Sequence, residues 1–154
     1  MGEHMMGNGQ MMGDQEMSMG KVEKIEWQDD MGMMNVQSTT NTLKWKLVDQ
    51  ETEKENMDIG WEFKTGDTVK IKVFNDDKSM HPMQHPIHIH GQKFLVLSTN
   101  GMKNDNLVWK DTTLIQTGDT VELLVQIDNP GDWVIHCHIA EHMEAGMMGK
   151  FKVI

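Results

Sequence analysis

The sequence predicts a single all-β domain over residues 39–154, built as a Greek-key sandwich or barrel, preceded by a flexible Met-rich tail at residues 1–38. Three observations support this prediction: short apolar runs that alternate with polar residues, Gly, Asn and Asp punctuation between these runs, and a repeated turn. No segment has a sustained helical stripe, and 154 residues leave room for one domain with its own core.

The expected strands are short, and most of them are amphipathic. Val69, Ile71 and Val73 alternate with lysines, for example, as a half-buried strand requires. The turn Thr-Gly-Asp-Thr-Val at 65–69 recurs at 117–121, and each copy leads into an expected strand. Two equivalent turns of this kind are typical of a Greek key. The other expected strands are 43–48, 94–97, 121–127 and 133–139.

Residues 1–34 form the Met-rich part of the tail, with 10 of the 17 methionines of the chain. This stretch has no period of 2 or 3.6, which indicates a flexible segment. It is either a leader without a role or a collector of Cu(I), because thioether sulfurs are soft donors. The Met5-Met6 and Met11-Met12 pairs, with His4 nearby, suit the second alternative.

Charge and hydropathy exclude two classes of partner. The formal charge is −10, and all 14 basic residues are lysines, so the basic surface that nucleic-acid binding needs is missing. No apolar run approaches the roughly 18–20 residues of a membrane span, and the N-terminus lacks a secretory pattern. We therefore expect no nucleic acid and no membrane among the partners, and the sequence itself gives no localisation.

Seven of the eight histidines lie in two short stretches of the sequence. The lone Cys137 cannot form an internal disulfide, so it serves packing, reactivity or metal ligation. Cys137, His142 five residues later and Met147 five residues after that follow the order in which a blue-copper site receives its sulfur, nitrogen and axial thioether. His85 is the leading candidate for the second imidazole. The two clusters are His81, His85, His88 and His90, and His136, His138 and His142.

Strand parity divides these ligands into two sets. Successive side chains of a strand point to opposite faces, so Cys137 faces one way while His136 and His138 face the other. His88 and His90, also two residues apart, form a matching outward pair. The sequence thus predicts four outward imidazoles at a second copper site, joined to the first through the backbone of Cys137, which is a short path for electrons.

At these residues the sequence resembles the C-terminal cupredoxin domain of multicopper oxidases, the laccase-like family. The motifs His-Pro-Ile-His-Ile-His-Gly at 85–91 and Gly-Asp-Trp at 131–133 through Met147 carry the resemblance, which covers about residues 60–154. It implies a cupredoxin-like Greek-key fold and copper as cofactor. It implies type 1 ligands His85, Cys137 and His142 with Met147 axial, a type 2 ligand His88, and type 3 ligands His90, His136 and His138.

The sequence also departs from the family pattern. Family oxidases complete a trinuclear cluster with four further histidines from an N-terminal domain, and the two His-x-His motifs that supply them are absent from this sequence. The cluster therefore needs a homo-oligomer that shares the face formed by His88, His90, His136 and His138, or the N-terminal domain of a longer oxidase. Met143 stands where many bacterial relatives have a glutamate implicated in proton delivery, with Glu141 and Glu144 nearby.

Three functions agree with these residues. The first is a laccase-like oxidase, which takes single electrons from phenols, aromatic amines or Cu(I) and reduces dioxygen; Cys137, His136 and His138 would carry its electrons. The second is a mono-copper electron carrier, and the third is a copper-handling or resistance protein that uses the Met-rich tail. The family resemblance suggests a periplasmic or extracellular location. The plainer alternatives are Cys137 or Met147 as core filler and His81 as a surface residue. The other interpretation of His81 is a copper or substrate-edge role.

Overall fold

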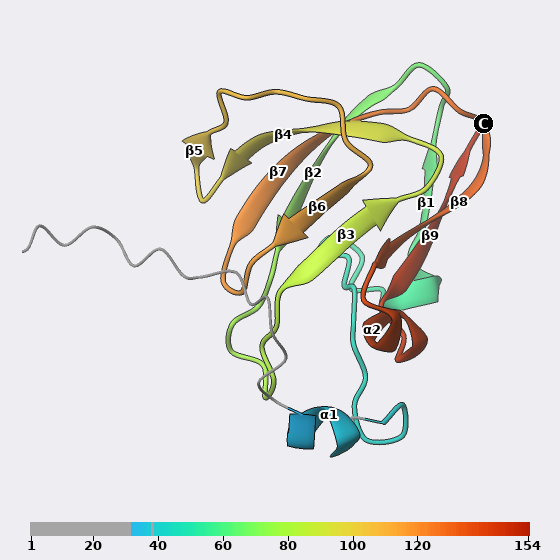
Figure 1. Ribbon diagram of the computed structural model, residues 1–154. Coiled ribbons are helices and arrows are strands. Elements are labelled where there is room, and N and C mark those ends of the chain that lie inside the picture. Colours follow the sequence, from blue (N-terminus) through green and yellow to red (C-terminus); the bar gives the residue numbers. More distant parts are fainter. Residues whose placement is uncertain (1–31, 38) are drawn as a thin grey trace, which may run out of the picture.

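In the computed structural model, which describes residues 32–37 and 39–154, two β-sheets pack face to face around one core (Figure 1). The first sheet has the strand order β1-β9-β8-β3-β6. Its β1–β9 pair is parallel and its other pairs are antiparallel. The strands of this sheet are β1 (Gly60–Phe63), β3 (His85–Ile89), β6 (Thr112–Ile115), β8 (Gly131–Cys137) and β9 (Met148–Val153).

The second sheet has the order β2-β7-β4-β5 and is antiparallel throughout. The repeated turn seen in the sequence leads into β2 and β7, which pair along their whole length. Gly66 and Gly118 occupy equivalent places in the two turns with φ values of 95° and 82°, a conformation that glycine adopts without strain. The strands of this sheet are β2 (Thr68–Phe74), β4 (Lys93–Thr99), β5 (Met102–Lys103) and β7 (Thr120–Gln126).

Helices are few and short in the described part of the chain. They are α1 (Gly32–Gln37), the 3-10 turn η1 (Asn56–Asp58) and α2 (Ala140–Glu144). Helix α1 lies inside the segment predicted as a tail, while residues 1–31 and 38 lie outside the described residues, so the predicted tail and its boundary stay a prediction. No helix of the described ranges is both long and apolar enough to span a bilayer.

One expected strand is wrong. Residues 43–48 belong to neither sheet, and only Val48 pairs, with Glu55 in an isolated bridge. The alternation of half-buried and exposed side chains is present, but the backbone hydrogen bonds go elsewhere: Trp45 N–H donates to the carbonyl of Ala145, and Leu47 N–H donates to the side-chain oxygen of Asn56. These bonds hold the segment to loops beside the sheets, while Trp45 and Leu47 pack against the core.

The remaining expected strands are present with shifted ends. The strand expected at 133–139 is β8, which begins at Gly131 and ends at Cys137. Strands β1, β3, β5, β6 and β9 were not among the expected strands; they are two to six residues long, and runs this short give little periodic signal.

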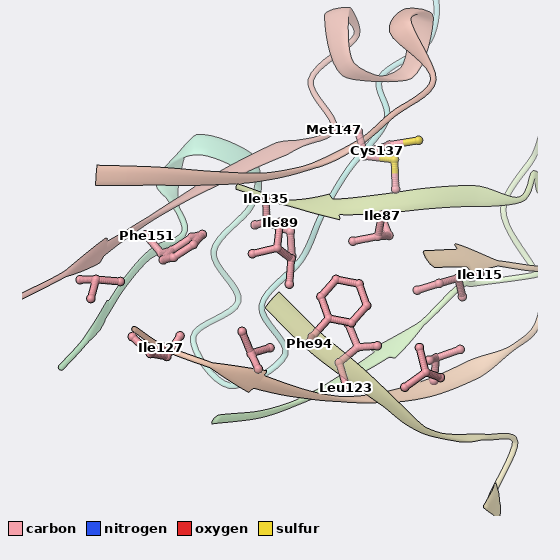
Figure 2. Packing of buried hydrophobic residues seen from close by; sticks show 14 residues of the cluster. Ile87, Ile89, Phe94, Ile115, Leu123, Ile127, Ile135, Cys137, Met147 and Phe151 are labelled. Atoms are coloured by element: carbon pink, nitrogen blue, oxygen red, sulfur yellow. The ribbon is translucent and has the colours of Figure 1, made fainter. Parts of the chain in front are cut away.

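The core lies between the two sheets (Figure 2). Phe94 and Leu123 of the second sheet are fully buried, and they face Ile87, Ile89 and Cys137 of the first. Inward and outward residues alternate along β3 and β7, as expected for strands with one face in the core. Cys137 therefore belongs to the core face of β8, and its neighbours along the strand point the other way.

Candidate metal centre

Three donor side chains meet at one end of the core. Cys137 ends β8, His85 begins β3, and His142 lies in α2. The Cys137 sulfur lies 3.6 Å from Nδ1 of His85 and 3.5 Å from Nδ1 of His142, and the two nitrogens are 3.1 Å apart. Strand pairing brings them together, because Cys137 lies opposite Ile87, two residues along β3 from His85.

These three side chains are almost completely buried. His85 and His142 are 6% and 4% exposed, and Cys137 is fully buried. Burial lowers the pKa of His85 to about 4, helped by His142 beside it, and burial also lowers the pKa of His142 to about 4 against the opposing effect of Glu141. Both imidazoles are therefore neutral near pH 7, which leaves lone pairs for a metal ion.

Met147 completes the surroundings of the three donors. It is 6% exposed and belongs to the same buried cluster as Cys137 (Figure 2). The backbone N–H of Cys137 donates to the carbonyl of Met147 at 3.1 Å, and the N–H of Met147 donates to the carbonyl of His142 at 3.0 Å. The loop after α2 is thus folded back so that a thioether lies next to the end of β8.

The cysteine and its histidines do not form a nucleophilic pair. Burial raises the pKa of the Cys137 thiol to about 11, so the thiolate that attacks substrates is scarce near neutral pH. The side chain also has no exposed surface that a substrate could reach. A bound cation would change this, because a metal that ligates the sulfur displaces its proton.

A second group lies on the outer face of the first sheet. The register places Thr112, His88, His136 and Met148 in one row across strands β6, β3, β8 and β9. Residues opposite each other on neighbouring strands share a face, so this row faces away from the core. His90 joins the row from beyond the end of β3, with its Nε2 2.9 Å from Nε2 of His136.

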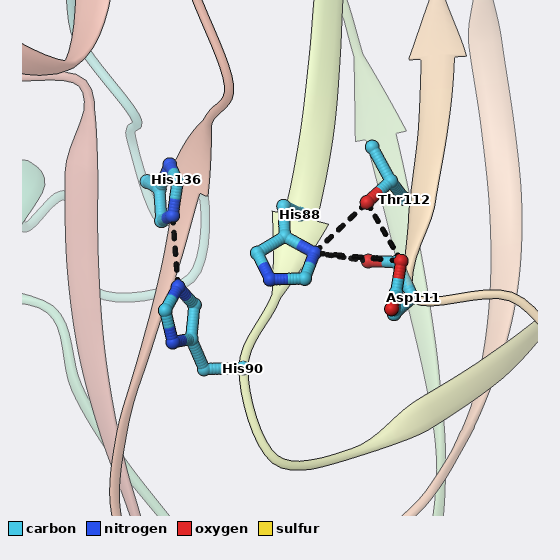
Figure 3. Close-up of polar contacts among 5 residues, drawn as sticks. All are labelled: His88, His90, Asp111, Thr112 and His136. Carbon is cyan, nitrogen blue, oxygen red and sulfur yellow. Dashed lines mark hydrogen bonds and ion pairs between the residues drawn. The ribbon is translucent and has the colours of Figure 1, made fainter. Parts of the chain in front are cut away.

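Hydrogen bonds fix the orientation of two of these imidazoles, and Figure 3 shows those of His88. Nδ1 of His88 lies 2.9 Å from both the carbonyl of Asp111 and the hydroxyl of Thr112, and Nδ1 of His136 lies 2.8 Å from the carbonyl of Cys137. A carbonyl only accepts, so both Nδ1 atoms carry the proton and both Nε2 atoms carry a lone pair. Metal-binding histidines have this second hydrogen bond as a rule.

His138 is the fourth member of the outer group. It is exposed, and its ring lies 5.7 Å from those of His88 and His136, centroid to centroid. Its backbone N–H donates to the carbonyl of Pro86 at 2.7 Å, which holds the chain just after β8 against β3. The pKa of neighbouring His90 is lowered by partial burial and then by His88, His136 and His138, so this imidazole resists protonation.

The two groups lie on opposite faces of the first sheet, at the end of β8. Cys137 faces the core with His85 and His142, while His136 and His138 face outward with His88 and His90. The separation predicted from strand parity agrees with this geometry. The roles of the individual ligands stay a prediction.

The inner donor set fits copper. Two imidazole nitrogens and a thiol within 3.1–3.6 Å of one another, beside a buried methionine, form the soft His₂Cys set with a weak thioether that copper selects. Mg²⁺ and Ca²⁺ prefer oxygen ligands, and neither group of described residues contains a carboxylate. The outer imidazoles suit copper equally.

Sequence reasoning missed two residues around the inner group. Trp45 stacks on His142 with ring centroids 4.0 Å apart, and it lies in a segment whose contacts no local pattern reveals. Asn75, 8% exposed, donates from its side chain to the carbonyls of Met83 and Ile115 at 2.7 and 3.1 Å, which anchors the chain before His85 to β6.

Comparisons with known proteins identify relatives of this chain. A family model described as Multicopper oxidase matches residues 26–154. The multicopper oxidase mco of Staphylococcus aureus is 30% identical over 159 residues, covering 90% of this chain and 36% of the relative. The oxidoreductase tpcJ of Aspergillus fumigatus is 31% identical over 128 residues, covering 71% of this chain and 21% of the relative.

Solved structures of similar fold include multicopper oxidases. The multicopper oxidase from Campylobacter jejuni has a TM-score of 0.55 at 32% identity, covering 62% of this chain and 20% of that one. The multicopper oxidase from Pediococcus acidilactici has a TM-score of 0.57 at 34% identity, covering 62% and 21%. The chain thus spans between 20% and 36% of the length of these four relatives. Its two-sheet sandwich is cupredoxin-like, and the chain belongs to the multicopper oxidase family.

Proposed function

We propose that this chain is the cupredoxin domain of a laccase-like oxidase, with a type 1 copper site inside and half of a trinuclear copper cluster outside. The type 1 ligands are His85, Cys137 and His142, with Met147 axial. In the outer group His88 is the type 2 ligand, and His90, His136 and His138 are the type 3 ligands. The domain comprises residues 39–154, and the chain before it is the tail.

The observation that carries the proposal is the position of Cys137 between its two neighbours. Its sulfur belongs to the buried group, while His136 and His138, one residue to either side, belong to the outer group. One backbone segment therefore joins both candidate sites. An isolated structural metal site has no need of this arrangement, whereas a path for electrons between two sites does.

Copper bound at these positions would accept single electrons from a reducing substrate and deliver them to dioxygen. Phenols, aromatic amines and Cu(I) are the proposed reductants. The residues of the chain would contribute neutral imidazoles, a thiol that releases its proton when its sulfur binds the metal, and a buried pocket around them. We propose a periplasmic or extracellular location on the family resemblance.

The outer group needs a second set of histidines. Four imidazoles are too few for three metal ions, so the face must meet either a second copy of this chain or a further domain. Half-buried apolar residues share the outward face with the histidines and suit a protein contact. A two-fold contact would use the same face twice and would bring four plus four imidazoles together. These apolar neighbours are Pro86, Leu114, Val134 and Met148.

The substitution His138→Ala tests the shared cluster. His138 contributes to the outer group alone, so we expect oxygen consumption with a phenolic reductant to fall to background while the blue band of the type 1 site stays. Both are measured on the same copper-loaded sample, which makes the blue band an internal control for folding. Full oxygen consumption by the variant would contradict the shared cluster.

A second function is favoured by the incomplete outer group. Since the described residues offer four outward imidazoles, a chain that stays alone would be a mono-copper electron carrier. About one copper per chain without oxygen consumption would support the carrier, and more copper with oxygen consumption would support the oxidase.

The copper-handling function of the Met-rich tail concerns residues outside the described ranges. It is tested by Cu(I) loading with and without residues 1–34.

A further inference from the structure

Trp45 touches both imidazoles of the inner group. Its indole stacks on His142, with ring centroids 4.0 Å apart and planes 28° apart, and meets His85 edge-on at 5.1 Å and 74°. Stacked and edge-on aromatic contacts have preferred geometries. The ring planes of the two histidines are therefore restrained by Trp45 as well as by strand β3 and helix α2, which carry them.

The backbone around Trp45 is fastened to the loop that follows α2. Trp45 N–H donates to the carbonyl of Ala145 at 3.2 Å, and the carbonyl of Trp45 accepts from the side chain of Asn56 at 3.2 Å. Gly146 makes this approach possible: it has φ 115°, and a Cβ there would lie 3.3 Å from the carbonyl oxygen of Trp45. The contact between Trp45 and His142 is thus held by the backbone.

A second aromatic ring lies against Trp45. His81 packs on the same indole with ring centroids 5.9 Å apart, and it is 7% exposed. Its Nε2 is buried and has no hydrogen-bond partner among the described residues. Trp45 and His81 together form an aromatic cap beside His142.

We propose that Trp45 is a positioning residue of the copper site: it holds His142 in its ligating orientation and keeps water from the ligands, which raises the reduction potential. This rests on the proposed type 1 site. With the thiolate of Cys137 bound, the Cu(II) centre carries one more positive charge than the Cu(I) centre. A dry environment disfavours the more charged state, so the cap stabilises Cu(I).

The test is a redox titration of the blue band in variants of Trp45. In Trp45→Leu, which removes the stacked ring and admits water, we expect the Cu(II)/Cu(I) equilibrium to shift at least about tenfold toward Cu(II), which is 59 mV lower for one electron. Trp45→Phe keeps an aromatic face on His142 and should restore most of the potential. If Trp45→Leu does not fold, Trp45→Met takes its place.

Trp61→Leu is the matched control. Trp61 is also half-buried, donates from its indole to Asp49 at 3.1 Å and packs on Phe63, but it contacts none of the histidine rings. Its variant should keep the parent potential even if it loses stability. A parent potential in the Trp45 variants, or an equal fall in Trp61→Leu, would overturn the proposal. A parent without a blue band would instead contradict the type 1 site itself.

Discussion

The buried residues of the inner group are neutral until a metal ion arrives. His85 and His142 have pKa values of about 4, and the Cys137 thiol has a pKa of about 11, all because burial disfavours the charged forms. Neutral imidazoles are ready to bind, and only the thiol has to lose a proton. Because the three donor groups are neutral and already lie close together, they are preorganised for a soft cation.

A substitution can test the proposed axial role of Met147. Met147→Leu keeps the volume of the buried side chain and removes the weak thioether donor that stabilises Cu(II), so the reduction potential of the blue site should rise while its colour stays. A redox titration measures this. Met102→Leu, at a 77% exposed position in β5, is the control and should change nothing. A lower potential in Met147→Leu would count against its axial role.

At the scale of the elements, the pairing of β3 with β8 builds both sites at once. His88 lies opposite His136, and Ile87 lies opposite Cys137. A slip of one residue in this register would send the histidines into the core and the cysteine to the surface. The turn after β3 protects the register, because Gly91 there packs against the ring of Trp133.

Gly91→Ala should therefore be strongly destabilising. Gly91 has φ 70°, and a Cβ would lie 2.4 Å from the indole of Trp133. Positive φ costs about 1–2 kcal/mol for alanine, and overpacking adds about 1–3 kcal/mol. Gly101→Ala is the matched control, since Gly101 has φ 78° with nothing within 4 Å of its Cβ. Chemical denaturation should show a clearly larger loss for Gly91→Ala; equal losses would refute the close approach.

Elements also show what the sequence could predict and what it could not. Alternation and the repeated turn predicted β2, β4, β7 and β8, and parity separated Cys137 from His136 because the period of a strand is fixed. The segment 43–48 has the same alternation but pairs with loops, so local pattern could not reveal it. Trp45 and Asn75 escaped prediction for a related reason: their partners lie far along the chain.

At the scale of the whole molecule, the proposed cluster requires a partner at the outer face of the first sheet. His88, His90, His136 and His138 lie on it without a facing set in the described residues. The chain covers only 20–36% of the four relatives compared above, so a further domain or a second copy could supply the missing imidazoles. In either case copper would be bound by both partners.

Assembly and copper loading should therefore be linked. If copies of this chain share the cluster, copper that binds across the contact stabilises the oligomer by mass action, and removal of copper weakens it. Sedimentation with copper and after chelation measures the change in mass. His88→Ala with His136→Ala should abolish the dependence on copper. A copper-loaded monomer that still reduces dioxygen would rule out a cluster shared between copies.

The central claim, that Cys137 is the thiolate of a blue copper site, is tested most directly by the visible absorption spectrum of the copper-loaded chain. Thiolate-to-copper charge transfer should give the parent a strong band in the red, and Cys137→Ser should abolish it. His138→Ala, one residue away on the opposite face, should keep the band. An unchanged spectrum in Cys137→Ser, or a parent without the band, would contradict the account.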